Sequence, residues 1–247
     1  MKSKLLVFMF LLVTHMGMTQ NTHFWDGIET FDGPTDENPI LASQLDFYFD
    51  RMVAPLPDSI TLEIDRLVER ASFNTDLRDF ILWQLLQKYS HPEYMSQDQV
   101  FVYLYDQYFS QLKIKDLNET NLPLIHEKAE RLRRLALFNI APSIDGFLDL
   151  QSIESDYTIL FFYDHNCDLC HQERNDLDSI SAVHPEIVVL AIDMNTDDVR
   201  VDTLYDLYDI ETTPLIYVLD SEKRIIAKKI RAKQIPLILP SSLEGQP

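Results

Sequence analysis

The chain has 247 residues, of which 40 are acidic and 21 basic, so its formal net charge is −19. Such a charge argues against a protein that binds nucleic acid or anionic lipid headgroups through a basic surface. Hydrophobic residues make up 46% of the chain and glycine contributes only 5 residues, which indicates packed domains and not a low-complexity chain. Only two cysteines occur, too few for a small scaffold held together by disulfides.

The first residues predict an export signal. Lys2 and Lys4 precede an apolar run over 5–13, and small or polar residues follow up to Thr19, which is the layout of a secretory signal peptide. As a helix the run would rise only ~14 Å, less than half of the roughly 30 Å hydrocarbon core. We therefore expect residues 1–19 to be removed and the mature protein to be soluble in a bacterial periplasm, where disulfides form.

Residues 24–138 show the apolar period of packed helices. The segment 58–71, for example, places Ile60, Ile64 and Leu67 on one face. Further helices are expected over 41–53, 77–85, 96–112 and 121–136, the third of them opened by a capping box, Ser96-Gln-Asp-Gln99. This pattern predicts an all-α helical domain, which could serve as a binding module or mediate a homodimer.

Over residues 140–240, which open with Ala141-Pro142, the pattern changes to alternating strands and helices. The apolar runs 157–163 and 186–193 have strand length and predict strands that are covered on both faces. The remaining elements are expected as helices over 170–183 and 198–208, a hairpin of 215–219 and 224–230, and a short helix from about Ala232. This order implies an α/β fold, a mixed sheet sandwiched by helices.

The segment Cys167-Asp-Leu-Cys170-His171 fits two patterns, a redox-active C-x-x-C dithiol and the C-x-x-C-H attachment sequence of a c-type haem. The pair follows a predicted buried strand and opens a predicted helix, whose dipole and free N–H groups stabilise a thiolate. We therefore expect Cys167 to be the exposed catalytic cysteine and Cys170 to be the shielded one. Thr213-Pro214 precedes the strand 215–219, a position where a proline is tolerated because it need not donate to the sheet and where the Thr-Pro peptide bond can be cis.

Three alternatives stay open for this cysteine pair. A haem would need His171 and a distant second ligand such as Met194, and the strands around the motif leave little room for the macrocycle. A zinc ion would need a fourth ligand beside Cys167, Cys170 and His171. A structural disulfide would close so short a loop that it constrains little chain entropy. Dithiol exchange needs no metal or organic cofactor, so none is expected.

Residues 140–240 resemble the thioredoxin superfamily, and in particular its exported TlpA-like and ResA-like thiol-disulfide oxidoreductases. The residues that carry the likeness are the strand 158–163, Cys167 and Cys170 followed by Glu173, Thr213-Pro214 and the Ala141-Pro142 segment. The helical half, with Phe24-Trp25 and the phrase 62–68, is similar to the uncharacterised helical domain that precedes such modules in some secreted bacterial proteins.

The resemblance implies that Pro214 is cis and packs against the cysteines, and that the backbone of Thr213 pairs with a substrate strand. It also implies disulfide-containing protein substrates and a membrane-linked dithiol protein as electron donor. The chain departs from the family at Asn166, where many members have tryptophan, and at Phe161, where thioredoxin has a buried acid.

Without that buried acid, proton transfer to the second cysteine must come from water or from another group, and the nearest carboxylates are Glu173 and Asp164. Asp168 places a negative charge beside the Cys167 thiolate, which makes the reduced form less favourable, whereas a protonated His165 would oppose this effect. We therefore expect a reductase or isomerase of protein disulfides. The alternative is a non-catalytic binding or dimerisation protein that uses the thioredoxin-like scaffold with a structural disulfide.

Overall fold

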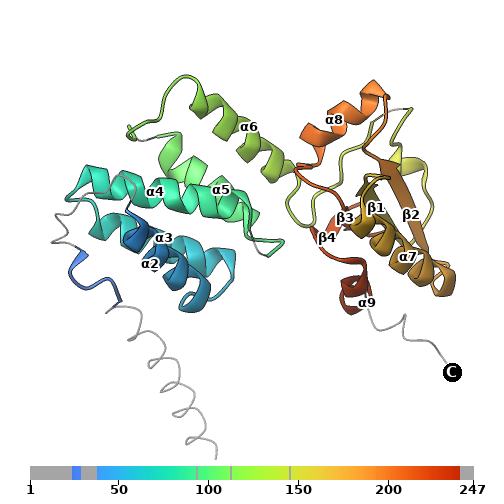
Figure 1. Cartoon of the computed structure of the whole chain (residues 1–247), viewed down its shortest axis with the longest axis horizontal. Helices are drawn as coiled ribbons and strands as arrows, with labels where there is room; N and C mark the ends of the chain where they lie inside the picture. The colour runs from blue at the N-terminus through green and yellow to red at the C-terminus, as the bar shows by residue number, and fades with distance from the viewer. Residues whose placement is uncertain (1–23, 29–37, 93, 112, 145, 240–247) are drawn as a thin grey trace, which may run out of the picture. The chain divides into compact units, whose positions relative to one another are not determined.

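The computed structural model describes residues 24–28 and 38–239, except 93, 112 and 145 (Figure 1). The predicted signal peptide, residues 1–19, lies outside this range. The chain divides into two compact units, the first ending at Leu122 and the second beginning at Pro123. Nearly all of helix α6 (Asn121–Arg134) therefore belongs to the second unit, whereas the sequence pattern grouped its residues with the helical half. Within the described ranges, no helix combines the length and apolar character that a bilayer span requires.

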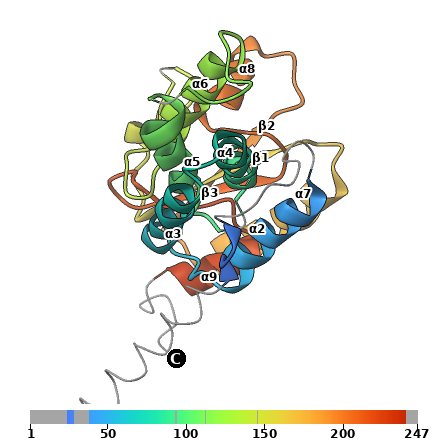
Figure 2. The same cartoon turned by 90° about the vertical axis from the view of Figure 1, so that its left-hand side faces the viewer.

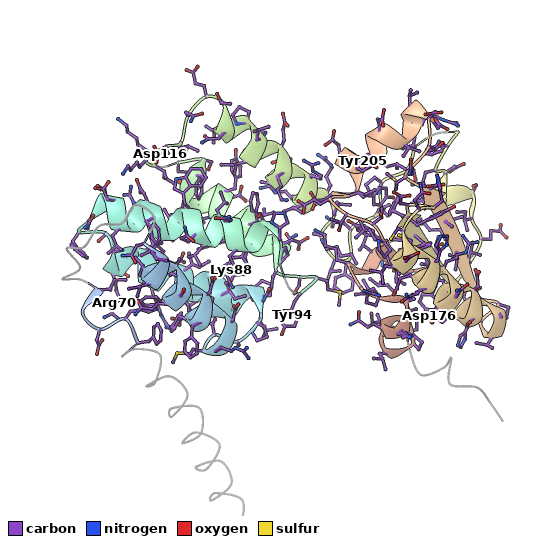
Figure 3. All side chains as sticks on the ribbon, viewed as in Figure 1. Arg70, Lys88, Tyr94, Asp116, Asp176 and Tyr205 are labelled. Atoms are coloured by element: carbon purple, nitrogen blue, oxygen red, sulfur yellow. The ribbon has the colours of Figure 1, made fainter. Side chains whose placement is uncertain are left out.

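The first unit is helical, as the sequence predicts. Its elements are α2 (Pro39–Arg51), α3 (Pro57–Arg70), α4 (Thr75–Ser90), α5 (Asp98–Leu104) and the π-helix η2 (Tyr105–Phe109). Helix α4 packs against α2, α3 and α5 (Figure 2). Asn74 caps α4 by accepting the N–H of Leu77 at 3.1 Å. Lys88 of α4, labelled in Figure 3, lies 2.6 Å from Asp50 of α2 and joins the two helices.

The capping box predicted at Ser96 is wrong. Helix α5 begins two residues later, at Asp98, and its N-cap residue Gln97 makes no capping hydrogen bond through its side chain. The N–H of Gln99 instead donates to the backbone carbonyl of Ser96 at 3.3 Å, so this segment forms a turn. The single helix expected over 96–112 is α5 continued by the π-turn of η2, a local insertion that apolar periodicity does not reveal.

The second unit contains a four-stranded mixed sheet in the order β2-β1-β3-β4. Strand β1 pairs in parallel with β2 and antiparallel with β3, and β3 pairs antiparallel with β4. The element bounds are β1 (Tyr157–Tyr163), α7 (Asp168–Val183), β2 (Ile187–Asp193), α8 (Val199–Leu207), β3 (Leu215–Leu219), β4 (Ile225–Lys228), η4 (Ala232–Gln234) and α9 (Ile235–Ile238). The predicted α/β order, with the β3–β4 hairpin, is confirmed.

Strand β1 is buried because both faces of the sheet are covered. Leu160 and Phe162 pack with Tyr208 and Tyr217 in a core that also includes side chains of α8. Side chains alternate along a strand, so Phe161 points to the opposite face, where α7 lies (Figure 1). The cysteine pair therefore lies at the start of a helix that packs against the buried central sheet.

A buried carboxylate links α6 to the segment after α8. Asp209 is 4% exposed, and its oxygens lie 3.0 Å from Lys229 Nζ, 3.6 Å from Arg131 Nε and 3.9 Å from Lys128 Nζ. Its φ of 50° lies in the left-handed region, which aspartate and asparagine tolerate better than most residues. The two α6 cations make further ion pairs, Arg131 with Asp206 and Lys128 with Glu211.

Two lysines of the second unit are buried. Lys228 of β4 is 1% exposed and donates to the backbone carbonyl of Leu135, just after α6. Lys223, in the hairpin turn, is 2% exposed and donates to the Thr158 hydroxyl at 2.9 Å. Burial lowers the pKa of Lys223, and the neighbouring charge of Asp220 opposes this shift.

Candidate active site

The cysteine pair lies where β1 ends and α7 begins. Cys167 is the N-cap residue of α7 in an extended conformation, and its Sγ accepts the backbone N–H of Cys170 at 3.2 Å. The N–H of Cys167 donates to the carbonyl of Asp164 at 3.1 Å, which fixes the turn that leads into the helix. A sulfur atom in this position faces the positive end of the helix dipole, which stabilises negative charge on it.

The two sulfurs have different surroundings. Both cysteines are free thiols, Cys167 partly exposed and Cys170 only 1% exposed. Burial raises the pKa of the Cys170 thiol, and its hydrogen bond with the Cys167 side chain raises it further. Hydrogen bonds from the Asp164 backbone and the Thr213 side chain oppose this rise. Cys170 therefore holds its proton more firmly than an ordinary cysteine.

The structure brings Thr213 and Pro214 to this site. The Thr213–Pro214 peptide bond is cis, and both residues are partly exposed just before β3. The Thr213 side chain hydrogen-bonds to Cys170, so the segment before β3 and the first turn of α7 meet at the second sulfur. This leaves the backbone of Thr213 beside the cysteines, at the surface of the unit.

Glu173, one turn after Cys170, connects α7 to the C-terminal segment. It is 3% exposed, and its Oε1 accepts the Arg231 Nε–H while its Oε2 accepts the N–H of Ala232, each at 2.7 Å. Both carboxylate oxygens are therefore engaged in holding η4 against α7. Proton transfer by Glu173 stays a hypothesis.

The Asp164 carboxylate is turned toward the neighbouring loop. Its Oδ1 accepts the N–H of Asn166 at 2.7 Å and the Nδ2–H of Asn195 at 3.1 Å. These hydrogen bonds, together with the charge of His165, hold the pKa of Asp164 below its usual value. A carboxylate stabilised in this way is a weak base, so proton transfer by Asp164 also stays a hypothesis.

The sequence pattern missed one contact beside the cysteines. His165 Nδ1 lies 2.7 Å from Oδ2 of Asp193, the last residue of β2, and Oδ1 of Asp193 accepts the N–H of Asn195 at 3.0 Å. The sequence held a signal for this contact. The predicted strand 157–163 is followed directly by Asp164 and His165, and the predicted strand 186–193 ends in Asp193. Since β1 and β2 run parallel, their carboxyl ends meet at one edge of the sheet.

A groove of about 600 Å³ lies along β2, which is an edge strand of the sheet in the described residues. Its lining includes the β2 stretch 189–193, Phe147 and Leu148 from the segment before β1, Arg174 of α7 and Val201 of α8. The groove reaches the cysteine site at Asp193, the partner of His165.

The described residues do not bring together the ligands that a haem or a zinc ion would need. His171 is exposed on α7, whereas Met194 is 5% exposed and packs in the hydrophobic core of the unit. Within the part of the chain that the structure describes, no three His, Cys, Asp or Glu side chains form a group that could hold a metal ion.

Comparison with known proteins identifies the fold. No family model matches the chain, and neither does any curated protein. Among solved structures, a thioredoxin-like protein from Bacteroides caccae is similar over 90% of this chain and 91% of its own, with 15% sequence identity and a TM-score of 0.68. This similarity shows that the chain has a thioredoxin-like α/β fold with a helical N-terminal region.

Two further matches each cover 44% of this chain. A domain of a possible thiol-disulfide isomerase from Cytophaga hutchinsonii covers 44% of this chain and 95% of its own, at 27% identity and a TM-score of 0.38. The thioredoxin domain of a thiol-disulfide oxidoreductase from Bacteroides vulgatus covers 44% and 96%, at 19% identity and a TM-score of 0.36. The TlpA-like or ResA-like subfamily, and the identity of the helical domain, stay predictions.

Proposed function

We propose that this protein is an exported thiol-disulfide oxidoreductase that reduces or isomerises protein disulfides through Cys167 and Cys170. The observation that carries the proposal is the difference between the two sulfurs: Cys167 is partly exposed at the N-cap of α7, while Cys170 is buried behind it with a raised pKa. Such a pair supplies one cysteine that attacks the substrate disulfide and a second thiol that resolves the mixed disulfide.

In the first step, the Cys167 thiolate attacks one sulfur of a substrate disulfide. The substrate S–S bond breaks, a mixed disulfide with Cys167 forms, and the other substrate sulfur leaves as a thiolate and takes up a proton. Cys170 then loses its proton and attacks the Cys167 sulfur, which releases the second substrate thiol. Two electrons and two protons pass from the dithiol to the substrate disulfide, and no metal or organic cofactor takes part.

The Thr213 backbone and Pro214 are the proposed binding surface for the substrate strand, because the Thr213 side chain hydrogen-bonds to Cys170 and both residues are partly exposed. The substrates are disulfide-containing proteins in the periplasm, and a membrane-linked dithiol protein would return the Cys167–Cys170 disulfide to the reduced state. The negative charge of Asp168, in the first turn of α7, supports reduction or isomerisation over strong oxidation. A reduction potential near about −120 mV, typical of a strong periplasmic oxidase, would contradict this direction.

Insulin reduction by the wild type and by Cys167→Ser tests the activity, with loss expected only in the variant. The Cys170→Ser variant should trap substrates as mixed disulfides, because its second step is blocked. Equal and negligible reduction by the wild type and Cys167→Ser would favour the alternative, a binding or homodimerising protein whose helical unit contacts the partner.

A further inference from the structure

Two turns meet beside the cysteine pair. The turn 164–166 follows β1 and leads directly into Cys167, and the turn 193–195 closes β2 on the neighbouring strand. The N–H of Met194 donates to the carbonyl of Tyr163 at 2.7 Å, so the pairing of the two parallel strands continues to the start of both turns.

Two side-chain contacts join these turns. His165 Nδ1 lies 2.7 Å from Asp193 Oδ2, and Asn195 Nδ2 donates to Asp164 Oδ1 at 3.1 Å. We refer to these four residues as the turn clamp. Each carboxylate of the clamp also accepts a backbone N–H of its own turn, from Asn166 in the first and from Asn195 in the second. All four side chains are therefore engaged.

The turn clamp is linked to both sulfurs through the backbone of Asp164. Its carbonyl accepts the N–H of Cys167 at 3.1 Å, and a backbone hydrogen bond from the same residue reaches the Cys170 thiol. A shift of Asp164 would therefore move the N-cap sulfur and change a hydrogen bond to the second sulfur at the same time.

We propose that His165 and Asp193 are positioning residues that hold Cys167 at the N-cap of α7 for attack. This inference rests on the proposed dithiol exchange and adds a residue pair to it. An imidazole–carboxylate contact is an ion pair while the imidazole carries its second proton, and a weaker hydrogen bond after that proton is lost. The charged groups that face His165 are Asp193 at the end of β2 and Asp164 in its own turn. Both are acids, so the contact is strongest while the imidazole is protonated.

The test is the rate at which iodoacetamide alkylates Cys167 in the reduced full chain, resolved from Cys170 by peptide mass spectrometry. Three variants are compared with the wild type at about pH 6 and pH 8: His165→Gln, Asp193→Asn and the double variant. Asp197→Asn is the matched control, because it removes the charge of an exposed carboxylate near the same turn without touching the clamp.

Each single variant is expected to slow alkylation by about threefold at pH 6, the size expected for a partly exposed ion pair. The double variant should be no slower than either single variant, because both remove the same contact. At pH 8 all should approach the wild-type rate, and Asp197→Asn should match the wild type at both values. Asn195→Ala breaks the other contact, an amide–carboxylate hydrogen bond without an imidazole, so its effect should be equal at both pH values.

Wild-type rates for His165→Gln and Asp193→Asn at pH 6, or additive effects in the double variant, would overturn the positioning role. A purely structural effect would lower the rate equally at pH 6 and pH 8, and this result would also overturn it. Alkylation needs no disulfide substrate, so it can be measured even if the wild type fails to reduce insulin. That failure would refute the proposed function without deciding the positioning role.

Discussion

Replacement of Asp209 by asparagine should destabilise the second unit strongly. Asparagine keeps the size of the side chain and tolerates the positive φ of 50°, so the change removes mainly the charge. The carboxylate is 4% exposed and faces three cations, of which Lys229 is nearest, at 3.0 Å. Removing one partner of a buried ion pair costs about 3–5 kcal/mol. Arg131 and Lys128 keep Asp206 and Glu211 as partners, so we expect about 3 kcal/mol, the lower end of that range.

The assay is urea unfolding of Asp209→Asn and wild type followed by circular dichroism, since both tryptophans of the chain, Trp25 and Trp83, lie in the helical unit. Asp206→Asn is the matched control. It removes the same charge from a carboxylate that is 89% exposed and 2.8 Å from Arg131, and exposed ion pairs contribute at most about 1 kcal/mol. Equal losses of unfolding free energy in the two variants would refute the reasoning that burial makes the contribution of the Asp209 charge to stability large.

Three further predictions concern single side chains. Because burial lowers the pKa of Lys223 in the folded state, the unfolded chain binds more protons between that pKa and about 10.4, so wild-type stability should rise with pH there. Lys223→Met should lack this rise, and parallel stability profiles of the two proteins would contradict it. Glu173→Gln should lower the unfolding free energy by about 2 kcal/mol while insulin reduction per folded molecule changes less than about twofold; a large loss of turnover would instead support proton transfer by Glu173. In the reduced wild type, iodoacetamide should label Cys167 at least about tenfold faster than Cys170, measured by peptide mass spectrometry, and equal rates would rule out the two-sulfur mechanism.

The second unit was predictable because its signals are local. The apolar run 157–163, the C-x-x-C pair directly after it and the hairpin around Asp220 each specify one element within a few residues, and their succession predicts a mixed sheet covered by helices. The side-chain network around the site was less predictable. The contact between His165 and Asp193 joins residues 28 positions apart, and it appears only once β1 and β2 are known to be parallel neighbours.

The placement of α6 shows the same limit more clearly. Its apolar face has helical spacing like the helices before it, so periodicity alone groups it with them. Two contacts with residues far along the chain hold it to the second unit. Arg131 of α6 pairs with the buried Asp209, and the buried amine of Lys228 donates to the carbonyl of Leu135, just after α6. Lysines are rarely buried without a partner, so the sequence alone would place Lys228 at the surface. Its burial depends on the Leu135 carbonyl, which only the fold brings to it.

The attachment of α6 also decides where this protein can be cut. A truncated protein that starts at Ala141-Pro142, where the thioredoxin-like pattern begins, would leave Asp209 without two of its three cations and Lys228 without the Leu135 carbonyl. Two buried charges would then lose partners at once, which few domains of this size tolerate. The smallest fragment of the second unit that folds on its own is therefore expected to start near Asn121, about twenty residues upstream of the point that the motif suggests.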